Sequence, residues 1–144
     1  MTVADLIGSR KVVFSVPKTA TVHEAARYLR DNQVRAVGVL GEQGRLIGVV
    51  SQSDISDKVA AENKCPAWMR VPEIMSTDLV LIKPATPLDE CLRLMEKHKI
   101  FHLAVVDDEG SFHGLISVQD LLRVIATDQK ARADMLEAYI FPSR

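Results

Sequence analysis

Apolar and polar positions along the chain follow one order of elements, and they follow it twice. In the first half, apolar runs of strand length and helix-spaced runs predict a strand, a helix, a hairpin of two strands and a further helix. We expect these elements at 11–16, 21–32, 34–40, 46–50 and 51–62. In the second half we expect them at 79–82, 86–98, 102–106, 112–116 and from 117, with the last helix continuing, bent or broken, to 140. Two shorter segments with matching apolar spacing, 2–7 and 71–75, lead into the halves.

Capping residues mark where several of these helices begin. Thr21 followed by Glu24 is a capping box, in which each side chain bonds the other residue's backbone N–H. Thr2 is placed to cap the lead-in helix. Thr86 is expected to cap the second-half helix with Pro87 at its first position, where a missing N–H costs nothing.

A fixed offset shows that the two halves are repeats. The pairs at an offset of 66 residues include Glu24 and Glu90, Val39 and Val105, Gly48 and Gly114, Ser51 and Ser117, and Asp54 and Asp120. Apolar positions exchange only for apolar ones, and no gap is needed between residues 24 and 54. We therefore predict an α/β (α+β) fold of two β-α-β-β-α repeats, 1–62 and 71–127, joined by a linker, 63–70, and followed by a helical extension, 128–144. Each unit is too small to bury its own sheet face well, so the two should pack with approximate twofold symmetry.

The motif Gly-x-x-Ser-x-x-Asp stands in both repeats at the end of a buried strand and the start of a helix. Backbone N–H groups are unpaired at such a junction and the helix dipole attracts anions, so each copy can form half of a polar site. The alternative is that serine and aspartate merely form a capping box. Because aspartate is shorter than the Glu or Gln that this box prefers, we expect it to close the box less well and to stay available to a ligand.

Composition excludes several classes of function. The 144 residues carry a formal net charge of −1 with lysines and arginines scattered among the carboxylates, which argues against a nucleic-acid partner. Neither a membrane-length apolar run nor a signal peptide is present, and Cys65 and Cys91 form no CxxC pair, so we expect reduced thiols in a cytoplasmic protein. There is no P-loop, no G-x-G-x-x-G, no metal-ligand cluster and no plausible nucleophile with a base, so we expect neither catalysis nor a metal site.

Three features together point to a known family: the two copies of Gly-x-x-Ser-x-x-Asp, the helix and strand that precede each copy, and the lead-ins ending at 6–7 and 74–75. In these features the chain resembles a tandem pair of cystathionine-β-synthase (CBS) domains, called a Bateman module. It is similar to the small stand-alone bacterial members. The resemblance implies a sensor that binds an adenosine-containing ligand in clefts between the repeats. We expect this ligand to be AMP, with NAD(H) and ATP as alternatives. The resemblance further implies homodimerisation through the helices and an enzyme or transporter regulated in trans. The apolar side of 121–140 can fold back on its own module or, as we expect, be covered by a symmetric partner.

The resemblance also implies roles for individual residues. Asp54 and Asp120 are expected to hold a ribose, because one carboxylate can accept hydrogen bonds from both ring hydroxyls. Ser51 and Ser117 are expected at ribose or phosphate. In the family, residues at the start of the first hairpin strand of one repeat reach the ligand whose ribose is held by the other repeat's aspartate. Arg35 is therefore expected to share a ligand with Ser117 and Asp120. His102 and Phe101 are expected to share one with Ser51 and Asp54. Arg70 is a further phosphate candidate, and the adenine is expected among Val13, Val16, Val80 and Ile82.

Each of these side chains also has a purely structural interpretation. Arg35 and Arg70 can be solvated cations, and His102 can be a packed strand histidine. Phe101 replaces a basic residue that relatives often carry, and the residues next to the aspartates include no lysine or arginine, so we expect modest phosphate affinity. If one cleft alone is filled, we expect it to be that of Asp120. The competing function is a protein-interaction module whose clefts are vestigial.

Overall fold

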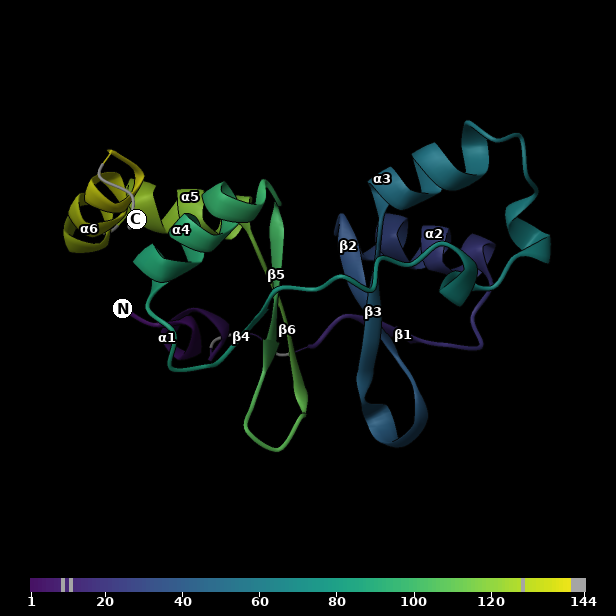
Figure 1. Ribbon diagram of the computed structural model, residues 1–144, viewed down its shortest axis with the longest axis horizontal. Coiled ribbons are helices and arrows are strands. Elements are labelled where there is room, and N and C mark those ends of the chain that lie inside the picture. The colour runs from purple at the N-terminus through teal and green to yellow at the C-terminus, as the bar shows by residue number, and fades with distance from the viewer. Residues whose placement is uncertain (9, 11, 128, 141–144) are drawn as a thin grey trace.

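Two three-stranded sheets form the centre of the protein. The computed structural model describes residues 1–8, 10, 12–127 and 129–140. Each sheet places its first strand parallel to the second, and the second antiparallel to the third (Figure 1). The strands are β1 (Ser15–Pro17), β2 (Ala36–Leu40) and β3 (Leu46–Ser51) in the first sheet, and β4 (Leu81–Ile82), β5 (His102–Val106) and β6 (Phe112–Ser117) in the second.

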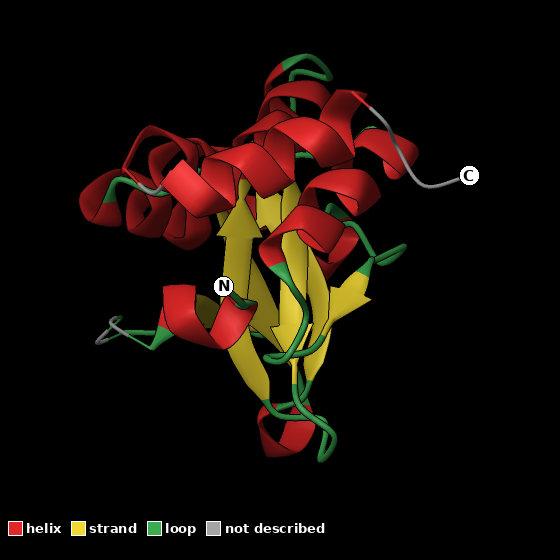
Figure 2. Cartoon of the chain, turned by 90° about the vertical axis from the view of Figure 1, so that its left-hand side faces the viewer, coloured by secondary structure: helices red, strands yellow, loops and turns green. Residues whose placement is uncertain are grey.

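Most of the helices lie together at one end of the sheets, whereas the helix nearest the N-terminus lies apart, alongside the strands (Figure 2). The helices are α1 (Val3–Ile7), α2 (Val22–Asn32), α3 (Gln52–Ile55), α4 (Leu88–His98), α5 (Val118–Thr127) and α6 (Gln129–Ile140). A π-helical turn, Ser56–Ala60, continues α3, and 3₁₀ turns occupy Glu42–Gly44, Pro66–Trp68 and Val71–Glu73. This mixed α/β architecture confirms the predicted fold class and the order of its elements.

The register of the two hairpins repeats residue for residue. Ala36 pairs with Ser51 in the first sheet, and His102 pairs with Ser117 in the second. Both hairpins change register at the same place, between Val39 and Leu40 and between Val105 and Val106. The strand-to-helix junctions of the two repeats are therefore built on equivalent backbone frames.

Several predicted boundaries were wrong. The strands β1 and β4 are shorter than expected, and part of the predicted first strand, at residue 11, lies outside the described residues, as do 128 and 141–144 of the predicted extension. Thr86 does not cap α4: its hydroxyl accepts a hydrogen bond from the Lys83 N–H (3.0 Å), and Pro87 takes the cap position. In place of one helix from 117, the structure has the two helices α5 and α6, and α6 packs against both α4 and α5.

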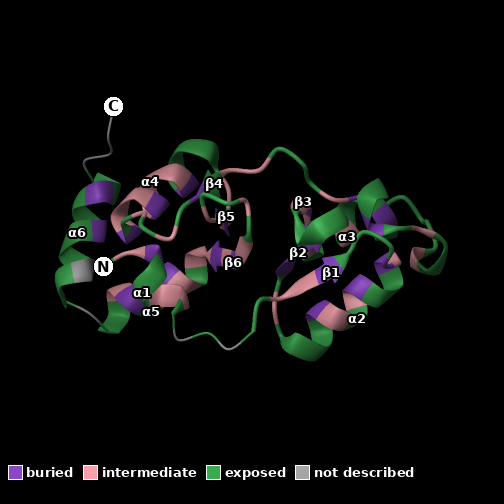
Figure 3. Cartoon of the chain, turned by 90° about the horizontal axis from the view of Figure 1, so that it is seen from below, coloured by how far each residue is buried: buried purple, intermediate pink, exposed green. Residues whose placement is uncertain are grey.

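Each half has its own apolar core, and each core is completed by the lead-in of the other half. Val3 is fully buried among second-half residues, and its N–H donates to the Thr86 carbonyl (2.9 Å). Val71 is fully buried in the first-half core, and its N–H donates to the Ala20 carbonyl (3.0 Å). The helix α1 accordingly lies beside α4 and β6 rather than with its own repeat, and buried positions face inward within each half (Figures 1 and 3). Neither repeat is complete without the first residues of the other.

The halves also meet through their sheets. The strand β2 contacts β6, and Arg45 forms an isolated bridge with Ser111. The ring of Phe112 lies directly over Gly38, where an added Cβ would be 2.5 Å from the ring. This close approach requires glycine on β2.

The exchange of lead-ins predicts crossed effects of two matched substitutions. Val3→Ala and Val71→Ala each remove two buried methyl groups, which should lower the free energy of unfolding by about 2 kcal/mol. Hydrogen exchange followed by mass spectrometry should show lost protection in β5 and β6 for Val3→Ala and in β2 and β3 for Val71→Ala. Loss of protection within each residue's own repeat would contradict the exchange.

Candidate functional site

Two cavities of similar size lie between the halves. The Asp120 cleft, about 660 Å³, is lined by residues of both repeats, among them Arg10, Val13, Arg35, His102, Ser117 and Asp120. The Asp54 cleft, about 680 Å³, is lined by Ser51, Asp54, Val80, Phe101 and His102, with Arg35 again at its wall. The structure thus brings together the residues that the sequence assigned to each cleft. Both volumes fall in the range of small-molecule sites.

The aspartate of each motif closes a capping box. Ser51 donates its N–H (3.0 Å) and its hydroxyl (3.1 Å) to Oδ2 of Asp54, whose own N–H donates to Ser51 Oγ (3.2 Å). Ser117 and Asp120 repeat this arrangement at 2.8, 2.9 and 3.2 Å. The expectation that aspartate closes the box less well was wrong, because every bond of both boxes is formed. Because both bonds that the serine donates go to Oδ2, the box leaves Oδ1 of each carboxylate to other partners.

Those other partners fill the remaining acceptor positions of Asp54. Its Oδ1 accepts the Ser76 hydroxyl (3.2 Å) and pairs with the Lys58 ammonium (2.9 Å), which also donates to the Ile74 carbonyl. Each oxygen of Asp54 thus has two donors at 2.9–3.2 Å, which fills the roughly four acceptor positions of a carboxylate. With a side chain only 9% exposed, Asp54 is chiefly a structural group in this structure.

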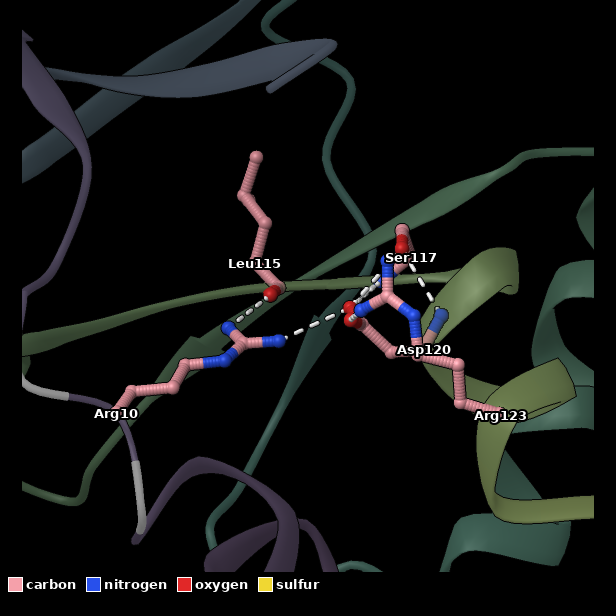
Figure 4. A network of polar contacts seen from close by, with 5 residues as sticks. All are labelled: Arg10, Leu115, Ser117, Asp120 and Arg123. Carbon is pink, nitrogen blue, oxygen red and sulfur yellow. Dashed lines mark hydrogen bonds and ion pairs between the residues drawn. The ribbon is translucent and has the colours of Figure 1, made fainter. Parts of the chain in front are cut away.

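Asp120 keeps one oxygen largely available. Arg10 donates from Nη2 to Oδ2 (2.9 Å) and from Nη1 to the Leu115 carbonyl (2.6 Å), so it lies across the cleft wall (Figure 4). At Oδ1 the guanidinium of Arg123 lies at the longer distance of 3.5 Å. The Asp120 side chain is 16% exposed, more than that of Asp54. Its Oδ1 can therefore accept hydrogen bonds from a ligand without breaking the helix cap.

Arg10 and Ser76 each lie between the lead-in and the first strand of a repeat, and each reaches the aspartate of a motif. Sequence reasoning missed both, because their segments carry no periodicity. Arg123 was also missed, although its spacing of three residues from Asp120 on one helix is a contact distance. The expectation of modest phosphate affinity rested on the residues next to the aspartates, whereas three arginines from other positions line the Asp120 cleft.

His102 lines both clefts, and its environment opposes its protonation. Burial lowers the pKa of this imidazole below its ordinary value, the carboxylate of Asp120 raises it, and the guanidinium of Arg35 lowers it. Arg35 itself is exposed, and its side chain makes no hydrogen bond or ion pair to another described residue. The wall between the clefts therefore carries one permanent cation and one imidazole that tends to stay neutral.

Three predicted ligand contacts line neither cleft. Val16 and Ile82 are buried in the two apolar cores, because the side chains that alternate along a strand point to opposite faces. Arg70 donates to the Thr19 carbonyl (2.7 Å) and so is held away from both cavities. The remaining base candidates do line clefts: Val13 that of Asp120, and Val80 and Phe101 that of Asp54.

Two other kinds of feature are absent from the described part of the chain. No group of three or more His, Cys, Asp or Glu residues there could hold a metal ion. No helix within it combines the length and the apolarity needed to cross a bilayer.

Known proteins match this sequence and this fold. The CBS-domain family model matches residues 3–61 and 71–127. The CBS domain-containing protein YhcV of Bacillus subtilis is 33% identical over 109 residues, which cover 76% of this chain and 76% of that protein. The chain spans 59% and 60% of the length of two other curated proteins that it matches.

Two similar solved structures contain ligands. The CBS domain pair of protein MJ0100, in complex with 5′-methylthioadenosine and S-adenosyl-L-methionine, is 25% identical with a TM-score of 0.78, covering 88% of this chain and 96% of that chain. CBS domain protein PAE2072 from Pyrobaculum aerophilum, complexed with AMP, is 23% identical with a TM-score of 0.83, covering 96% and 100%. At that identity the second likeness concerns the fold alone.

The two aspartates differ in their hydrogen-bond partners, so replacing each by alanine should lower the free energy of unfolding by different amounts. Asp54→Ala should lower the free energy of unfolding by about 2–3 kcal/mol, because it removes a helix cap and leaves Ser76 and Lys58 without their acceptor. Asp120→Ala removes a cap whose other partners are solvated arginines, and should cost about 1 kcal/mol. Urea unfolding measures both, and equal losses would contradict the structural role given to Asp54.

The lowered pKa of His102 predicts a pH dependence of stability. The unfolded chain takes up a proton at this residue near pH 6.5, whereas the folded protein takes it up only at a lower pH. The contribution of His102 to the free energy of unfolding is therefore fully present above pH 6.5 and is lost as the pH falls below it. His102→Gln should therefore lose less stability than the parent protein between pH 7 and pH 5. Urea unfolding at several pH values measures this difference, and an equal or larger loss in the variant would refute it.

Proposed function

We propose that this chain, which belongs to the CBS-domain family, is a regulatory rather than a catalytic module that binds a phosphorylated adenosine ligand in its Asp120 cleft. AMP is the ligand we favour, with NAD(H) and ATP as alternatives. A second copy of the chain and an enzyme or transporter regulated in trans are the partners we propose.

The observation that carries the proposal is the meeting of one available carboxylate oxygen with three arginines in one cavity. Oδ1 of Asp120 offers an acceptor for ribose hydroxyls, and Ser117 lies beside it at the start of α5. Arg10, Arg35 and Arg123 supply permanent positive charge that can bind phosphate. Three cations against one carboxylate match a single phosphate group of nearly two negative charges better than a triphosphate.

The ligands of similar structures support the adenosine part of the proposal. Protein MJ0100 is in complex with two adenosine derivatives, and PAE2072 with AMP. Apolar side chains such as Val13 offer the base a surface in the Asp120 cleft.

A ligand in this cleft would join the two halves. Arg10 and Arg35 come from the first half, whereas Ser117, Asp120 and Arg123 come from the second. Binding then favours whichever arrangement of the halves lets both sets of side chains reach the ligand, and regulation follows from this difference in affinity. The exposed apolar side chains Leu122, Leu136, Tyr139 and Ile140 on α5 and α6 suit a dimer surface through which the change can pass.

One observation favours the second candidate, a protein-interaction module. Trp68 is 86% exposed on the 3₁₀ turn Pro66–Trp68, and tryptophan is enriched among the residues that dominate protein interfaces. This surface is compatible with ligand binding, since Trp68 lines neither cleft.

Thermal shift tests the proposal. AMP at one hundred times its dissociation constant should stabilise the protein by about 2.7 kcal/mol, which raises the melting temperature by several degrees. Asp120→Asn and Arg35→Gln should each reduce this shift, because they remove a ribose acceptor and a phosphate cation. Arg27→Gln is the matched control, since Arg27 is exposed on α2 and lines neither cleft.

The same screen includes adenosine, ATP, NAD(H) and S-adenosylmethionine. Stabilisation by none of these compounds would refute the proposed function and leave the interaction module as the explanation. An AMP shift unchanged in both site variants would show that the ligand binds elsewhere.

A further inference from the structure

The two clefts share a backbone frame but differ in charge. In the described part of the chain, three arginines and one carboxylate line the Asp120 cleft, whereas Arg35, Lys99, Asp54 and Asp78 line the Asp54 cleft. The cations therefore exceed the carboxylates in the first cavity and only equal them in the second. A phosphate group would gain much less in the Asp54 cleft.

Equivalent positions show how this difference arises. Four pairs at the offset of 66 differ in charge where they line the clefts: Arg10 and Ser76, Val12 and Asp78, Arg35 and Phe101, and Gln33 and Lys99. In the first three pairs the residue that lines the Asp54 cleft is more negative or less positive than its counterpart, whereas Lys99 partly offsets this difference. The same frame thus carries two different ligand preferences.

The one arginine of the Asp54 cleft is shared. Arg35 lines both cavities, together with His102, Leu115 and Gln119. When a phosphorylated ligand in the Asp120 cleft engages this guanidinium, the Asp54 cleft is left with Lys99 facing two carboxylates. Lys58 offsets the charge of Asp54, but Asp78 is exposed and makes no hydrogen bond or ion pair with a described residue. A second phosphate is therefore disfavoured, whereas an uncharged ligand is not.

The walls of the Asp54 cleft are suited to a base and a sugar. Leu79, Val80, Ile100 and Phe101 give it an apolar side, and the Phe101 ring is 69% exposed and free to stack on a planar base. Asp54 has no spare acceptor position, so Asp78 is the carboxylate of this cavity that is available to sugar hydroxyls.

Resting on the function proposed for the Asp120 cleft, we propose that the Asp54 cleft is a second site that takes an uncharged adenine nucleoside and rejects phosphorylated ones. The residue at 101 sets this selectivity. One module then binds two chemically different ligands at once, a nucleotide and a nucleoside.

Isothermal titration with AMP and adenosine tests this inference. The protein should bind one AMP per chain, and the AMP-saturated protein should still bind one adenosine. Two equal AMP sites, or no adenosine binding to the AMP-saturated protein, would overturn the inference while leaving the proposed function standing. If AMP does not bind at all, the proposed function fails, and the inference is then judged on adenosine alone: one bound adenosine supports it and none overturns it.

A matched pair of substitutions places each ligand in its cleft. Val13 and Leu79 stand at equivalent positions, 66 residues apart, and each lines one cavity only. Leu79→Trp should block adenosine binding to the AMP-saturated protein and leave AMP binding intact, whereas Val13→Trp should block AMP. Loss of the same ligand in both variants would refute the assignment.

Phe101→Arg tests the origin of the selectivity as a gain of binding. It gives the Asp54 cleft its own arginine, and should strengthen the binding of a second AMP by about tenfold or more, so that two AMP molecules bind per chain. Phe101→Leu keeps the wall apolar and should still bind one. If Phe101→Arg also binds only one AMP, position 101 does not set the selectivity.

Discussion

A serine that bonds one oxygen of an aspartate three residues later holds both strand-to-helix junctions of this protein in place. The capping box that these two residues form satisfies N–H groups at the start of a helix. It also fixes a carboxylate at the wall of a cavity. Because the box uses Oδ2 alone, the chemistry of each cleft is decided by what reaches Oδ1. Ser76 and Lys58 fill that oxygen in Asp54, whereas the guanidinium of Arg123 approaches it only loosely in Asp120. The two sites thus diverge through their neighbours, while the boxes themselves are the same.

This arrangement separates what the fold needs from what the ligand needs. The helix cap survives in both repeats, so the frame stays symmetric, while residues from distant segments such as Arg10 and Ser76 alter one site without disturbing the other. Arg35 and His102 lie at the wall that the two clefts share, so a charged ligand in one cleft alters the electrostatic potential in the other. A duplicated unit can in this way acquire two selectivities with few substitutions.

Much of this could be predicted from the sequence, because the repeat is exact in register. The offset of 66 located the hairpins and both junctions, and the resemblance to a tandem CBS pair drawn from them is confirmed by two matches of the family model. Pairing Arg35 with Asp120, and Phe101 and His102 with Asp54, also agrees with how the residues are grouped around the cavities. What failed depended on contacts between segments far apart in the chain. Arg10 reaches Asp120 across 110 residues, and no local pattern marks it. The burial of Val16 and Ile82 depended on which side of a two- or three-residue strand faces the core, which so short a run does not reveal.

The exchanged lead-ins have a consequence for how the chain reaches its folded state. Val3 cannot bury its side chain until residues some eighty positions later are present, and Val71 must return to a core that includes residues near Ala20. Contacts of such sequence separation slow folding, because loop closure must precede the burial that rewards it. They also tie the halves into a single cooperative unit, in which neither half can open far without exposing the core of the other. The tandem repeat is in this sense an interlocked pair whose two members fold together.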